Sequence, residues 1–135
     1  MLVRLMVLAV MSLGLMGAAS SQHDYAEGQI WEYHTRPGDE GSLLRIQKVE
    51  QLDKIGPVYH ISVIGVHFVR TPLTGQVQHL PVSQATLDAS VTRLSSSTAL
   101  FPDPSAGIAQ WRGAHGGVFT IPLADIVGLV EKTLQ

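Results

Sequence analysis

The segment Val58–Val69 constrains the fold of this chain more than any other. Its twelve residues are mostly β-branched, aliphatic or aromatic, and polar side chains such as His60 and Ser62 interrupt the apolar ones. Side chains of these types suit the pleated, half-buried surface of a sheet better than a helix. The segment therefore predicts a long strand, and Gly65 predicts a bulge or bend within it.

Three other segments predict partners for this strand. Ile30–Thr35 is aromatic and β-branched, Ser42–Glu50 carries regularly spaced apolar residues, and Gln76–Leu80 reads as a short edge strand that ends at Pro81. The loop Arg36–Gly41 contains proline and glycine in turn positions, so the first two segments are expected to form a hairpin. We expect about four strands in an antiparallel sheet.

Two helices are predicted after the strands. Ser83 is a good helix N-cap, and the stripe that follows it consists of Leu87, Val91 and Leu94. The second helix starts near Pro122, with apolar residues at Leu123, Ile126, Val127, Val130 and Leu134, and a short helical turn at Ile108–Arg112 precedes it. Strands followed by helices predict an α+β fold in which two helices pack on one face of the sheet.

Residues 1–20 resemble a secretory signal peptide. Arg4 precedes an uncharged run, Leu5–Met16, which is too short to span a bilayer, and small residues follow it. We expect cleavage near residue 20, leaving residues 21–135 as a single domain that is periplasmic or secreted and has no membrane segment. The exact cleavage position and the oligomeric state are left open.

Composition excludes several classes of function. The formal net charge is −2, and only 15% of the 135 residues are charged, so the basic surface typical of a nucleic-acid-binding protein is not expected. The absence of cysteine excludes disulfides, thiolate metal sites and a cysteine nucleophile. The sequence contains neither the phosphate-binding loop Gly-x-x-x-x-Gly-Lys-Ser/Thr nor the dinucleotide-binding motif Gly-x-Gly-x-x-Gly, and no cofactor is predicted.

The predicted sheet carries one candidate polar patch, made of Glu32, His34, His60 and Ser62. His60 and Ser62 stand two residues apart and face the same side of their strand, where Glu32 from a neighbouring strand could orient the imidazole. This arrangement supports a small hydrolase as the alternative function. The nucleophile-elbow motif Gly-x-Ser-x-Gly does not occur, so an ordinary polar sheet surface is the simpler interpretation.

Two further features bear on possible sites, the hairpin loop and the histidines. The hairpin loop is a candidate recognition loop formed by Arg36, Pro37, Gly38, Asp39 and Glu40. The six histidines include no pair at strand spacing and no His-Glu-x-x-His motif, so no metal site is predicted.

Four segments of the chain resemble a family of small, uncharacterised secreted proteins of Gram-negative bacteria. These segments are Gly28–Tyr33 with Thr35–Gly38, His60–Val66, Leu87–Thr92 and Gly117–Ile121. The resemblance implies one compact domain behind a signal peptide and implies no activity. The favoured function is a non-enzymatic binding or interaction module, similar to an inhibitor or immunity protein, with a protein partner in the periplasm.

Overall fold

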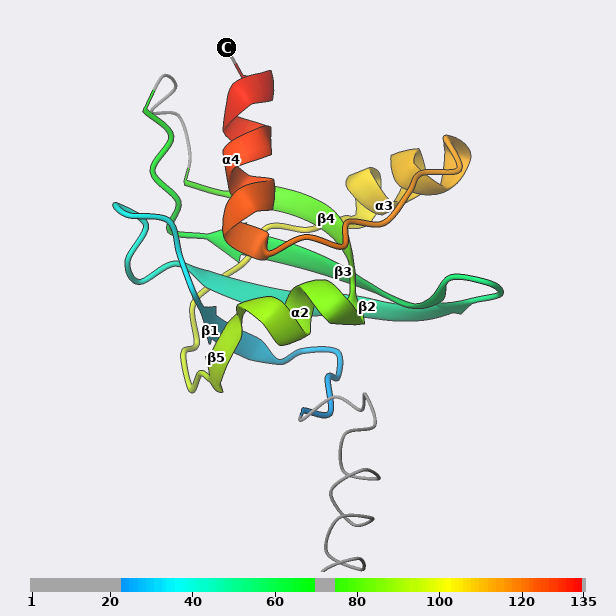
Figure 1. Ribbon diagram of the computed structural model, residues 1–135, viewed down its shortest axis with the longest axis horizontal. Coiled ribbons are helices and arrows are strands. Elements are labelled where there is room, and N and C mark those ends of the chain that lie inside the picture. The colour runs from blue at the N-terminus through cyan, green and yellow to red at the C-terminus, as the bar shows by residue number, and fades with distance from the viewer. Residues whose placement is uncertain (1–22, 70–74, 135) are drawn as a thin grey trace, which may run out of the picture.

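The computed structural model describes residues 23–69 and 75–134, and it is built on one antiparallel sheet (Figure 1). The strands pair in the order β4-β3-β2-β1-β5. Their bounds are β1 Ile30–Tyr33, β2 Leu43–Leu52, β3 Gly56–Ile64, β4 Val77–Ser83 and β5 Val91–Leu94. The described helices are α2 Gln84–Ser90, α3 Ser105–Gly113 and α4 Leu123–Thr133. The predicted α+β class with an antiparallel sheet is confirmed.

One face of the sheet forms the main core beneath α2 and α4 (Figure 1). Alternation along β3 turns Tyr59, Ile61 and Val63 toward this face, as the sequence predicts. The core is completed by the fully buried Leu87 of α2 and by the fully buried side chains of α4, which are Leu123, Ile126 and Val127.

The helix predicted to run from Ser83 to Leu94 is half the expected length. Ser83 is its N-cap, as predicted, and its hydroxyl accepts a hydrogen bond from the amide of Thr86 at 3.1 Å. The helix ends at Ser90, and the next four residues form β5 against β1 instead. Pairing with an otherwise open sheet edge outweighs the helical spacing of Val91 and Leu94, so the sheet gains a fifth strand.

The second face of the sheet is also covered, which the sequence did not predict. The segment 95–104, yellow in Figure 1, leads across this side to α3. Pro102 accepts hydrogen bonds from Gln47 and Ser62, and Ile108 of α3 is buried. The three helices therefore cover both faces of the sheet, and the prediction of two helices on one face was incomplete.

The bulge or bend predicted at Gly65 is a bend that follows the end of β3. β3 ends at Ile64, and Gly65 follows it in a left-handed conformation with φ +78°. The register shifts instead between Ile46 and Lys48 of β2, and again between Ile61 and Val63 where β4 pairs with β3. These two bulges change which side chains share a face.

The predicted leader, residues 1–20, lies outside the described residues. Within residues 23–69 and 75–134, no helix is both long enough and apolar enough to cross a membrane.

Candidate functional site

A row of three polar side chains crosses the second face of the sheet from β2 to β4. His60 Nε2 lies 3.1 Å from Oε1 of Glu50, and His60 Nδ1 lies 2.8 Å from Nε2 of His79. Arg112 of α3 donates to the same carboxylate oxygen of Glu50, and Lys48 Nζ lies 3.9 Å from it. The buried imidazole of His60 is therefore bonded at both nitrogens.

The bulge in β2 and the register of β4 against β3 create this row. Gln47 is the extra residue of β2, so Lys48 pairs opposite His60 and Glu50 falls on the same face. On β4, Pro81 pairs opposite His60, so His79, two residues earlier on the same face, lies diagonally beside the imidazole. Strict alternation along β2 from Ile46, which is opposite Ile61, would instead have turned Glu50 to the other face of the sheet.

Helix α3 closes over the row. The ring of Trp111 meets that of His60 edge-on at 4.8 Å, and Trp111 Nε1 donates to the carbonyl of Gly117 at 2.9 Å. Two glycines allow this close approach. A Cβ atom on Gly107 would lie 2.6 Å from Cβ of His79, and one on Gly116 would overlap the Trp111 ring. Larger residues at either position would push α3 away.

Both histidines of the row are uncharged at neutral pH. Burial, with a smaller contribution from His60 beside it, lowers the pKa of His79 to about 4. Burial also lowers the pKa of His60, although Glu50 opposes that shift. A carboxylate only accepts hydrogen bonds, so His60 Nε2 carries a proton toward Glu50 and its Nδ1 accepts one from His79. Nδ1 of His79 is then left as an acceptor, next to Gly107.

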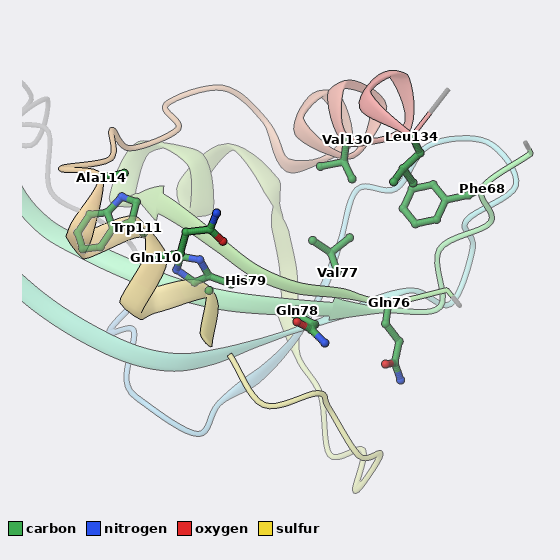
Figure 2. Close-up of a pocket in the computed structure, with 11 residues that line it drawn as sticks. Phe68, Gln76, Val77, Gln78, His79, Gln110, Trp111, Ala114, Val130 and Leu134 are labelled. Atoms are coloured by element: carbon green, nitrogen blue, oxygen red, sulfur yellow. The ribbon is translucent and has the colours of Figure 1, made fainter. Parts of the chain in front are cut away.

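A cavity of about 590 Å³ opens where β4, α3 and the end of α4 meet. Figure 2 shows His79, Gln110 and Trp111 at one end and Phe68, Val77, Val130 and Leu134 at the other. The remaining lining residues are Gln76, Gln78, Gly107 and Ala114. No side chain in this lining is charged at neutral pH, so the cavity suits an uncharged, partly apolar ligand.

The predicted polar patch is brought together only in part. His60 and Ser62 are fully buried on the same face, but the Ser62 hydroxyl donates to the carbonyl of Gln78 at 2.6 Å. Glu32 pairs instead with Arg93 of β5 at 2.9 Å, and His34 is exposed beyond the end of β1. Within the described ranges no hydrogen bond joins His60 to Ser62, so the geometry gives Ser62 no general base.

In the predicted recognition loop, two charged residues form internal contacts. Arg36 donates to Asp39 at 2.7 Å and to Glu131 of α4 at 2.7 Å. Asp39 is 1% exposed and accepts from the amide of His67, and Glu131 accepts from the amide of Val69. These contacts tie the hairpin loop to α4 and raise the pKa of Arg36, mainly through its hydrogen bond to Asp39.

The exposed part of this loop is smaller than the sequence suggested. Pro37, Gly38 and Glu40 face solvent. A recognition role for the loop stays a prediction, and it now concerns these three residues.

Glu50 and His79 are the site residues that sequence reasoning missed. Each falls in a segment that was predicted as strand. Glu50 faces His60 only because of the bulge in β2, which no turn residue marks, and His79 lies beside His60 because of the register of β4 against β3. The only signal was the concentration of histidines, with His79 in the predicted edge strand.

The described residues contain no group of three or more His, Asp or Glu side chains arranged to hold a metal ion. Comparison with known proteins does not assign this site to a family. No protein-family model matches the chain, and neither a curated protein nor a solved structure is detectably similar to it.

Proposed function

We propose that this protein is an exported, non-enzymatic binding module whose ligand occupies the cavity beside β4. The observation that carries the proposal is the uncharged lining of that cavity, in which the neutral His79 and the amide of Gln110 stand beside apolar side chains. A few polar groups in a mostly apolar hollow of this size are typical of a ligand site.

The nearby reactive groups support binding over hydrolysis. Ser62 is fully buried and bonded to a backbone carbonyl, which leaves its hydroxyl inaccessible to a substrate. His79 is a weak base because its pKa of about 4 lies well below neutral pH. A small hydrolase acting through His60 and Ser62 remains the alternative proposal, and it would require both side chains to become accessible.

A matched pair of probes tests the binding proposal. Benzamide and benzoate have the same shape and differ in charge, so we expect benzamide alone to perturb backbone amide resonances of His79, Gln110 and Ala114 in ¹⁵N-labelled protein. Changes clustered on another surface, or equal responses to the two probes, would overturn the proposal.

One substitution directly after α3 and one within it provide the variant and its control. Ala114 is exposed at the cavity, and Ala114→Trp should block the response by filling the opening. Ala109 is also exposed but lines a different hollow with Gln47 and Lys48, so Ala109→Trp should leave the response intact. Hydrolysis of p-nitrophenyl acetate that disappears in Ser62→Ala would favour the alternative instead.

A further inference from the structure

We infer that the ligand of this cavity is an extended, uncharged peptide segment of a partner protein that adds to the open edge of β4. The inference rests on the proposed function and specifies its ligand class. It depends on the edge of the sheet, on the chemistry of the cavity and on the two helices that flank it.

The outer edge of β4 already accepts one strand-like segment of the chain itself. The amide of Phe119 donates to the carbonyl of Pro81 at 3.0 Å, and the amide of Ser83 donates to the carbonyl of Phe119 at 2.9 Å. Val82 and Phe119 thus form a parallel bridge. The backbone nitrogen of Pro81 points to this outer side, so its lack of an N–H removes no hydrogen bond to β3.

The other end of the same edge is unoccupied by the described chain. Pro81 and Ser83 direct their backbone groups outward, and alternation directs those of His79 the same way. In residues 23–69 and 75–134, no backbone group bonds to His79 from that side. His79 also lines the cavity, so an incoming strand there would meet both free backbone groups and the pocket.

The cavity chemistry favours a peptide backbone over other neutral ligands. A sugar would need an aromatic face to stack on, but Phe68 is buried and Trp111 is packed between His60 and the close glycine Gly116. A charged segment would find no opposite charge in the lining.

The flanking helices favour a single segment over a second copy of this chain. Gln110 of α3 lies on one side of the cavity, and Val130 and Leu134 lie on the other (Figure 2). A lone strand can enter between them, whereas the sheet of another folded copy would meet both helices. Leu134 is 48% exposed and offers an apolar contact to a side chain of the entering segment.

A pool of hexapeptides, acetylated and amidated at their ends and randomised among uncharged residues, tests this inference. Selection on the immobilised protein should enrich binders that Ala114→Trp loses and Ala109→Trp keeps. One enriched peptide is then made with N-methyl groups on alternate amides, in the two possible registers. Because only alternate amides can face β4, one register should weaken binding at least tenfold and the other should change it little.

The possible results distinguish strand addition, the proposed binding function and a second copy of this chain. Equal effects of both N-methyl registers would overturn strand addition. Failure to enrich any peptide, with benzamide still bound in the cavity, would overturn this inference and leave the proposed function standing, whereas loss of both responses would overturn both. A concentration-dependent dimer in sedimentation that Ala114→Trp abolishes would identify a second copy as the occupant and overturn the peptide.

Discussion

Mild acid should destabilise this protein through the neutral histidine pair. The unfolded chain takes up a proton on His79 near its ordinary pKa of 6.5, but the folded chain does so only near 4 because burial opposes the charge. Between these values the unfolded state binds more protons, so the free energy of unfolding falls as pH decreases. His60 shifts in the same direction and adds to the effect.

The size of this loss follows from the His79 shift. One pKa unit corresponds to about 1.4 kcal/mol, so a group titrating at about 4 instead of 6.5 would cost about 2 kcal/mol on going from about pH 7 to about pH 5. His79 is only partly buried, so solvent screening reduces the expected loss to about 1 kcal/mol.

Urea unfolding followed by circular dichroism at about pH 7, 6 and 5 measures this loss. This pH range lies above the one in which Glu131 affects stability. The amide of Val69 and the side chain of Arg36 lower the pKa of Glu131 from its ordinary 4.5, so its contribution to the free energy of unfolding is lost only in stronger acid. His79→Gln should reduce the pH dependence, and His34→Gln at an exposed position should not. A free energy that stays constant from pH 7 to 5, or an unchanged slope in His79→Gln, would refute the reasoning.

Four further predictions concern stability and are read from urea midpoints. Gly107→Ala should cost about 1–3 kcal/mol because its Cβ would meet His79 at 2.6 Å, while Gly113→Ala, with no atom within 4 Å, should be neutral or mildly stabilising. Ile61→Ala at a fully buried site should cost about 2–5 kcal/mol, against little change for Ile55→Ala at 54% exposure. Ser83→Ala should cost about 1 kcal/mol by removing the N-cap bond to Thr86, and a loss below about 0.3 kcal/mol would contradict that role. Arg36→Met should cost about 2–4 kcal/mol because it leaves the buried carboxylate of Asp39 without its ion-pair partner, and adding Asp39→Asn should recover part of the loss.

Most of the sheet was predictable from local chemistry. Val58–Ile64 forms a strand because its side chains suit a pleated surface, and Ser83 begins a helix because its hydroxyl caps a free amide. The exception is β5. Val91 and Leu94 keep helical spacing with Leu87, but they form a strand because they pair with the open edge of β1. No local sequence pattern indicates that this edge is open.

The candidate site was less predictable because it depends on register. Aligning Glu50 with His60 requires an extra residue in β2, and no glycine or proline marks that bulge. His79 lies beside His60 because of the register of β4 against β3, which the sequence does not show. Of the polar patch predicted from alternation, the structure brings His60 and Ser62 together on one face, while Glu32 pairs with Arg93 and His34 lies exposed beyond the end of β1. The tight packing of α3, through Gly107 and Gly116, likewise shows only in three dimensions.

The central claim is that a ligand strand pairs with the free edge of β4 inside the uncharged cavity. Intermolecular nuclear Overhauser contacts between an enriched peptide and the ¹⁵N-labelled protein test it most directly. We predict contacts from alternate peptide amides to the backbone of His79, and from one peptide side chain to Leu134. Contacts confined to another surface, or to the side chains of the hairpin loop Arg36–Gly41, would contradict the account.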